Sequence, residues 1–285
     1  MRNTFKASLT AIAVAALAMA GQSAHASLIH QYTFNDGTAN DSVGTANGTL
    51  VGTATISNGQ LVLTGNAGTN NNADYVSLPA SNIDISSYTA VSFVTWFTAP
   101  ATPAVNSQLF ALGGTISGGG NNGRGYGYII ANPTTGGTAN YRTAISAGPS
   151  TEPGYTYGET SINGGLTSTI VGNGQHELVV TDDNSTLSIY LDGVLKNSTT
   201  VPSKNLLSGL NDSLAYIGKS VYSGDPLFAG SINEFDIYNN ALSATDVSNT
   251  FATGPVPVPE PASLGLTVFG AMGLLLLKRR NKSAA

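Results

Sequence analysis

Tyrosine and asparagine side chains gather in and beside two long glycine-rich segments, residues 113–125 and 148–165, which we expect to be loops. The members that could recognise a ligand are Tyr126, Tyr128, Tyr155, Tyr157 and Asn122. A tyrosine ring stacks on the apolar C–H face of a pyranose, while the phenol and nearby amides exchange hydrogen bonds with sugar hydroxyls. Because the segments carry little charge, the pattern predicts a site for neutral glycans with a dissociation constant of about millimolar to micromolar.

The same tyrosines also have a purely structural interpretation. Tyr126 and Tyr128 alternate along an expected strand and would then pack on their neighbours, and Tyr155 and Tyr157 would then anchor a loop. The sequence leaves both interpretations open.

Residue types that support other chemistries are scarce. The chain has no Cys, so it has no thiol nucleophile and no disulfide framework, and His30 and His176 are too few for a zinc cluster. No G-x-S-x-G motif occurs, and residues 118–123 match G-x-G-x-x-G without a following helix, which argues against a nucleotide site. We therefore expect no catalytic residues and no nucleotide cofactor.

Charge narrows the possible partners further. Between Ser27 and Pro255 there are five Lys and Arg against fifteen Asp and Glu, a net charge of about −10. Phosphate binding needs clustered positive charge, so nucleic acid is not expected as a partner.

The elements that would position a site are strands. In residues 176–196 apolar and polar residues alternate, and Asp192-Gly193 can adopt the positive φ angles of a tight hairpin turn. This segment predicts a three-stranded meander, whose apolar face must be covered by a second sheet.

The rest of the chain supplies further short strands separated by Gly, Asn and Pro. We expect them at 28–34, 48–52, 61–63, 75–78, 91–97, 108–112, 126–130, 141–145, 214–218 and 228–238, with a helical turn at 243–247. Trp96, the only tryptophan, lies among apolar strand neighbours and is expected to pack in the core. The pattern predicts an all-β antiparallel sandwich.

Residues 228–247 contain an apolar-Gly-x-Ile-x-Glu-Phe-x-Ile-Tyr strand followed by an Ala-Leu-Ser step into a short helix. This block, with the Tyr190-Leu-Asp-Gly193 hairpin, resembles the laminin-G-like, concanavalin A-like jelly-roll family, and the resemblance covers about residues 28–251. It implies one jelly-roll domain over 27–253, with a concave sheet whose rim loops carry glycan-binding residues.

The resemblance also includes enzymes. Laminarinase-type glycoside hydrolases of this fold carry a Glu-x-Asp-x-Glu strand, and the nearest string here runs from Glu234 through Asp236 to Tyr238. Tyr238 replaces the third acid, and the string lies in the last strand, so we expect a non-catalytic protein. A polysaccharide-degrading enzyme, hydrolase or lyase, and a purely structural biofilm-matrix protein remain the alternatives.

Related jelly rolls join their termini across a structural calcium. The resemblance implies one such Ca²⁺, with Asp36 and Asp236 as ligands, because Asp36 follows the first strand and Asp236 lies in the last. The alternative is that both are solvated acids.

The two ends carry processing signals. Arg2 and Lys6 precede an apolar run at 7–20 and the small-x-small string Ala24-His-Ala26, which predicts a signal peptide over residues 1–26 cleaved by signal peptidase. An uncleaved membrane anchor is the alternative.

At the other end, a Pro-rich linker at 254–258 leads to the segment 259–285. It contains Pro259, Glu260 and Pro261, an apolar run at 262–277 and a terminal Lys-Arg-Arg cluster. It resembles the PEP-CTERM sorting signal of Gram-negative bacteria. The resemblance implies processing by an exosortase, transient insertion in the inner membrane and a final location in the medium or on the cell surface. A permanent single-pass anchor is the alternative.

Overall fold

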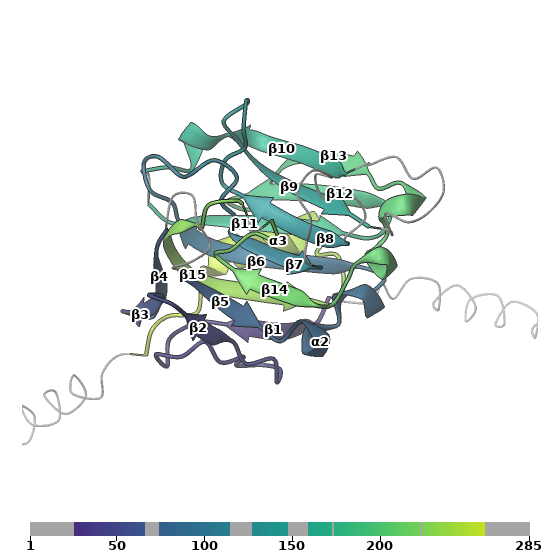
Figure 1. Ribbon diagram of the computed structural model, residues 1–285. Helices are drawn as coiled ribbons and strands as arrows, with labels where there is room; N and C mark the ends of the chain where they lie inside the picture. Colours follow the sequence, from purple (N-terminus) through teal and green to yellow (C-terminus); the bar gives the residue numbers. More distant parts are fainter. Residues whose placement is uncertain are drawn as a thin grey trace, which may run out of the picture.

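The computed structural model describes residues 26–65, 74–114, 127–147, 159–172, 174–222 and 224–259. They form two antiparallel β-sheets that lie face to face (Figure 1). The strands are β1 (Leu28–Tyr32), β2 (Thr49–Val51), β3 (Thr55–Ser57), β4 (Gln60–Thr64), β5 (Tyr75–Leu78), β6 (Val91–Thr98), β7 (Phe110–Gly113), β8 (Tyr128–Asn132), β9 (Asn140–Ser146), β10 (Thr160–Leu166), β11 (His176–Asp182), β12 (Thr186–Leu191), β13 (Val194–Thr200), β14 (Leu214–Ile217) and β15 (Ala229–Tyr238). The helices are α2 (Ala80–Ile83) and α3 (Ala244–Thr253), with 3-10 turns η2 (Ile85–Ser87), η3 (Thr167–Thr169), η4 (Ser203–Asn205) and η5 (Leu207–Gly209). The predicted antiparallel sandwich is confirmed.

The eight-stranded sheet has the order β13-β12-β11-β6-β15-β4-β3, with β1 paired to β15. The seven-stranded sheet has the order β10-β9-β8-β7-β14-β5-β2. The last strand, β15, lies between β6 on one side and both β4 and β1 on the other. The eight-stranded sheet therefore contains paired strands from both ends of the domain sequence, β1 and β15.

One apolar core fills the space between the sheets. Leu178 and Leu187 of the predicted meander are fully buried in it, as the alternation required. At its centre the rings of Phe93, Phe110 and Phe235 lie 4.7 to 6.2 Å apart between centroids. Aromatic burial of this kind contributes much of the free energy of folding.

The hairpin between β12 and β13 has the predicted turn. Asp192 and Gly193 have φ angles of 51° and 76°. These are the left-handed conformations that Asp and Gly tolerate and that a two-residue hairpin requires.

Residues 160–165 were expected to belong to a loop, and this expectation was wrong. They lie in β10, an edge strand paired with β9 in the seven-stranded sheet. Gly164 packs directly against the ring of Tyr141, whose hydroxyl donates a 2.9 Å hydrogen bond to the Gly164 carbonyl. A polar, glycine-containing segment thus becomes a strand because its partner strand supplies the packing.

The closing helix is longer than the predicted turn. It starts at the capping box of Ser243 and Asp246 and continues to Thr253 on the outer face of the eight-stranded sheet. Trp96 packs beneath it and is only 6% exposed, so its predicted burial is confirmed. The indole lies outside the inter-sheet core, because Trp96 points to the outer face of β6.

The residues that follow α3 lie against the β-sandwich and form hydrogen bonds with it. Asn35 donates its amide hydrogens to the carbonyl oxygens of Val256 and Pro257, at 3.1 and 3.2 Å. The backbone N–H of Val256 donates to the Glu234 carboxylate at 2.6 Å. The predicted linker is therefore exposed but hydrogen-bonded to the domain.

No helix within the described ranges is long and apolar enough to cross a membrane. The apolar runs predicted at 7–20 and 262–277, with Glu260 and Pro261, lie outside those ranges.

Candidate functional site

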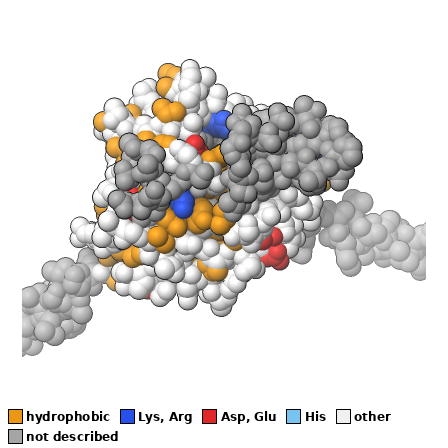
Figure 2. Space-filling view, in the orientation of Figure 1, with side chains coloured by type: hydrophobic (Ala, Val, Ile, Leu, Met, Phe, Trp, Pro, Cys, Tyr) orange, Lys and Arg blue, Asp and Glu red, His pale blue; other side chains and the backbone are white. Residues whose placement is uncertain are grey.

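The outer face of the seven-stranded sheet carries the candidate site. Along β8, Ile129 and Ala131 enter the core, whereas Ile130 and Asn132 turn outward. Asn132 pairs with Arg142 on β9, and directly paired residues share a sheet face. Figure 2 shows hydrophobic side chains, a class that includes tyrosine, around a basic side chain on the face of the molecule that this sheet forms.

A pocket of about 230 Å³ lies on this face. It is lined by Asn106, Gln108, Ile130, Asn132, Arg142, Glu159, Tyr222 and Asp225. The side chains of Gln108 and Asn132 are 1% and 3% exposed, yet Gln108 Oε1 and Asn132 Oδ1 have no hydrogen-bond partner. Arg142 Nε is also without a partner. Buried polar atoms without partners are costly, so this arrangement suits a ligand that brings hydroxyl groups.

A chain of hydrogen bonds supports the wall of the pocket. Tyr222 donates its hydroxyl to the hydroxyl of Tyr128 at 2.7 Å, and Tyr128 donates to Glu159 Oε2 at 2.6 Å. Arg142 Nη2 donates to Glu159 Oε1 at 2.5 Å, completing an ion pair. The Glu159 carboxylate is therefore fixed from both sides.

Asp225 is the second carboxyl of the pocket. Burial raises its pKa above the usual range, although the Ser220 hydroxyl, which donates a 2.7 Å hydrogen bond, and the Arg142 charge act in the opposite direction. Glu159 and Asp225 are thus carboxyls in different environments within one pocket.

An aromatic pair occupies the same sheet face on β5 and β14. The rings of Tyr75 and Tyr216 meet edge to face, 5.1 Å between centroids. Lys219 Nζ lies 4.2 Å from the centroid of the first ring and 4.8 Å from that of the second. Both tyrosines are partly exposed, so their rings are accessible to a flat apolar surface such as a sugar face.

The structure separates the residues predicted to bind the ligand. Tyr128 is fully buried and supports the wall of the pocket, so it cannot stack on a sugar. The other four, Tyr126, Tyr155, Tyr157 and Asn122, lie outside the described residues. The structural interpretation therefore holds for Tyr128, and the role of the other four remains a prediction.

The two predicted calcium ligands are not brought together. Asp36 lies in an exposed turn, where its carboxylate accepts hydrogen bonds from Thr38, and it lines a shallow pocket beside Pro259. Asp236 is 4% exposed and lines a separate cavity under α3. The described residues include no group of three or more His, Asp or Glu that could hold a metal ion. Calcium binding remains a prediction, without support from this pair.

The string that resembles a hydrolase strand is far from the polar pocket. Glu234, Asp236 and Tyr238 project from β15 on the outer face of the eight-stranded sheet, under α3. Burial raises the pKa of Asp236 well above its usual range, and the neighbouring Glu234 raises it further.

Sequence reasoning missed most of the pocket. The sequence placed Gln108 at the start of the strand 108–112 and Asn132 in the turn after the strand 126–130. It gave Tyr75 and Tyr216 no role beyond that of strand residues. The sequence signal that could have found them is a polar or aromatic residue at the alternate strand positions that point away from the core, as Asn132 does in Ile129-Ile-Ala-Asn132.

Residues 68–248 match the family described as the concanavalin A-like lectin/glucanases superfamily, Laminin_G_3. The chain belongs to this family. Its concanavalin A-like jelly-roll fold, expected from the resemblance, is thereby confirmed. A search of the curated proteins found no match.

Several solved structures share the fold. Domain 4 of AbnA, a GH43 extracellular arabinanase from Geobacillus stearothermophilus, in complex with arabinotriose, matches with a TM-score of 0.58 and 22% identity over 79% of this chain and 98% of that chain. The binding domain of Paraclostridial Mosquitocidal Protein 1 matches with a TM-score of 0.56 and 14% identity over 79% of this chain and 52% of that chain. The binding domain of Botulinum neurotoxin DC in complex with SialylT matches with a TM-score of 0.54 and 14% identity over 80% of this chain and 51% of that chain. This chain thus spans about half the length of the two toxin chains.

Proposed function

We propose that this protein is an exported, non-catalytic glycan-binding jelly roll whose ligand occupies the polar pocket and extends over Tyr75 and Tyr216. The observation that carries the proposal is the pair of buried amide oxygens, Gln108 Oε1 and Asn132 Oδ1, that face the pocket without partners. Sugar hydroxyls are donors of the right kind for these acceptors. The arabinotriose complex of the similar AbnA domain supports a sugar as the ligand class.

The charges of the pocket favour a neutral glycan. Arg142 is the only basic side chain among the described lining residues, and it is already paired with Glu159. Asp225 adds a further carboxyl, so an anionic group placed in the pocket would meet repulsion, although Lys219 carries a positive charge beside the rings of Tyr75 and Tyr216.

Binding to an array of neutral and anionic oligosaccharides tests this proposal, using the purified full chain and a Gln108→Met, Asn132→Leu double variant. We expect micromolar to millimolar binding of neutral glycans by the parent chain and at least a tenfold loss in the variant. The variant should keep or raise the melting temperature, because it removes amides that lack partners in the unliganded protein. Asn82→Ala, at an exposed residue of α2, is the matched control and should bind normally.

Absence of binding by the parent chain, or equal binding by parent and double variant, would contradict the assignment. The first result would favour a purely structural matrix protein, and the second would place the glycan elsewhere.

A second candidate, a glycoside hydrolase, is favoured by one observation. Glu159 and Asp225 share a pocket, Glu159 is paired with Arg142, and burial raises the pKa of Asp225, which suits a general acid beside a second carboxyl. Incubation with a polysaccharide panel decides between the two functions. Release of reducing ends that is lost in Asp225→Asn would establish the enzyme and replace the binding proposal.

We also propose that the ends are processed as their resemblances imply, with removal of residues 1–26 and exosortase cleavage of the segment 259–285. The intact mass of protein from the culture medium should lack residues 1–26 and the span 262–285. Replacing Pro259, Glu260 and Pro261 by Ala should retain the protein at the inner membrane. A secreted chain that still carries residues 274–280 would contradict sorting.

A further inference from the structure

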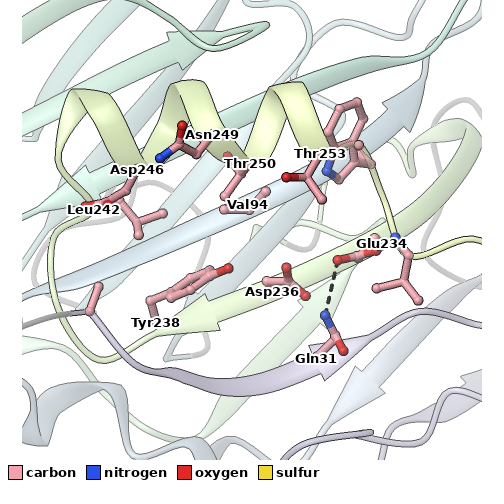
Figure 3. Close-up of a pocket in the computed structure, with 14 residues that line it drawn as sticks. Gln31, Val94, Glu234, Asp236, Tyr238, Leu242, Asp246, Asn249, Thr250 and Thr253 are labelled. Atoms are coloured by element: carbon pink, nitrogen blue, oxygen red, sulfur yellow. Dashed lines mark hydrogen bonds between the residues drawn. The ribbon is translucent and has the colours of Figure 1, made fainter.

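A second cavity, of about 380 Å³, lies on the opposite side of the sandwich from the polar pocket. Its floor is the outer face of the eight-stranded sheet, and α3 forms its roof. Figure 3 shows Asp236 and Tyr238 of β15 beneath Asn249 and Thr250 of α3, with Gln31 of β1 at the edge. Nothing in the proposed glycan site uses this cavity.

The cavity is acidic, and none of its described lining residues is basic. Glu234 and Asp236 line it from the floor at 5% and 4% exposure, and Asp246 lines it from α3. Glu177, which is fully buried, stands beside them on the same face, because both Glu177 and Glu234 pair with Trp96. Several carboxyls thus share one small space under the helix.

The hydrogen bonds inside the domain leave one carboxyl oxygen of the cavity floor without a donor. Glu234 has two donors, Gln31 Nε2 at 3.2 Å and the Val256 N–H at 2.6 Å. By contrast, Asp236 Oδ1 has no partner although the residue is almost completely buried. Burying a carboxyl oxygen without a hydrogen-bond donor costs free energy. A positively charged ligand that donates hydrogen bonds would offset this cost in the cavity.

The remaining walls suit an organic cation better than a metal ion. The described residues contain no group of three acids or histidines placed to enclose a metal. The cavity instead has the aromatic side chains of Trp96 and Tyr238, together with the amide of Asn249. Ammonium groups bind favourably between carboxylates and aromatic rings, and the volume is that of a small-molecule site.

We propose that the cavity between α3 and the eight-stranded sheet binds a small organic ammonium ion, with Asp236 and Glu234 as its main hydrogen-bond acceptors. The ligand would connect β15 to α3 and so hold the closing helix against the domain. Ligand binding at this place is independent of glycan binding on the other sheet.

Trp96 provides a direct readout, because it lines the cavity and is the only tryptophan. We expect titration of the purified full chain with 1,4-diaminobutane to change the tryptophan emission with a dissociation constant of about 0.1 to 1 mM, and to raise the melting temperature. The neutral analogue 1,4-butanediol should have no effect at the same concentrations.

Asp236→Asn keeps the shape of the side chain but cannot take up the negative charge that a bound ammonium ion would stabilise, so the variant should bind the diamine at least tenfold more weakly while remaining folded. Asp84→Asn, at an exposed acid that ends α2, is the matched control and should bind it normally. No response of Trp96 to the diamine, an equal response in Asp236→Asn, or a response to calcium chloride in place of the diamine would each overturn the proposal.

Discussion

The indole of Trp96 and the ring of Phe251 stack with their planes 7° apart and their centroids 5.9 Å apart. This contact joins the outer face of β6 to the last turn of α3, although 155 positions separate the two residues along the chain. Phe251 is 40% exposed, whereas Val247 of the same helix is fully buried in the cluster that contains Trp96. The stack therefore adds a contact at the last turn of α3 to the one that Val247 makes nearer its start.

Phe251→Ala should loosen α3 and expose the indole. We expect a loss of about 1 to 2 kcal/mol in the free energy of unfolding and a red shift of the tryptophan emission. Leu166→Ala, at a residue that is 58% exposed on β10, is the control and should cost less than about 0.5 kcal/mol without a spectral shift. An unchanged emission spectrum in Phe251→Ala would show that the stack does not hold the helix.

Asp41 organises the turn after β1. Its carboxylate lies 2.7 Å from His30 Nδ1 and accepts backbone N–H groups of Gln31, Gly44 and Ala46 at 2.8 to 3.0 Å. Burial alone would raise the pKa of Asp41, but the hydrogen bond to His30 and those from the backbone outweigh burial and lower it.

Because the folded state lowers this pKa, Asp41 contributes stability above its ordinary value near 4 and loses that contribution as pH falls further. Asp41→Asn should cost about 2 to 4 kcal/mol at pH 7 and much less at pH 2. Urea unfolding at the two pH values measures this difference, with Asp36→Asn in an exposed turn as the control. An equal cost at both pH values would contradict the assignment.

Glu177 should make the fold less stable as pH rises. Burial raises the pKa of the Glu177 carboxyl to about 7, well above the usual range of a glutamate. The folded state then holds a proton that the unfolded chain releases, so stability falls between about pH 4.5 and 7 and levels off above that range.

Glu177→Gln removes this dependence, since an amide does not ionise. In the absence of amines, the variant should gain about 1 to 3 kcal/mol at pH 8 relative to the parent and little at pH 4. Denaturant titration at both pH values gives the comparison, and a variant that is equally or less stable at pH 8 would disprove it.

Variants of Tyr128 and Tyr216 should distinguish a tyrosine that stabilises the fold from one that binds the glycan. Tyr128→Phe removes the hydroxyl that links Tyr222 to Glu159 and should cost about 1 to 2 kcal/mol of stability with little change in glycan affinity. Tyr216→Ala removes one ring of the exposed pair and should weaken glycan binding about threefold to tenfold. Glycan titrations and melting curves of the two variants test both statements, and the opposite assignment of effects would rule out the aromatic pair as part of the site.

The sequence by itself determined the type of fold, because the decisive signals were local. Alternation in 176–191 placed Leu178 and Leu187 in the core, and Asp192-Gly193 specified a turn that needs positive φ angles. The pattern of residues 228–247 was the main signal that indicated the laminin-G-like family. Each of these features depends on neighbours within a few residues, so a single sequence reveals it.

Only the tertiary structure decided which side chains share a site. The polar pocket combines Gln108, Asn132, Arg142, Glu159 and Asp225, which come from five separate segments. Their proximity follows from the strand order β10-β9-β8-β7 and from a segment after β14 that crosses the sheet, and no local pattern encodes that order.

The same reason accounts for Tyr128 and α3. The alternation of residues along β8 puts Tyr128 on the outer face of the sheet. The residues that contact and bury it there, Tyr222 and Glu159, come from distant parts of the chain. Likewise, α3 continues to Thr253, and its last turn is supported by the stacking of Phe251 on Trp96 of β6. Strand periodicity is a local property of the backbone, whereas burial and partnership depend on long-range packing that a single sequence does not specify.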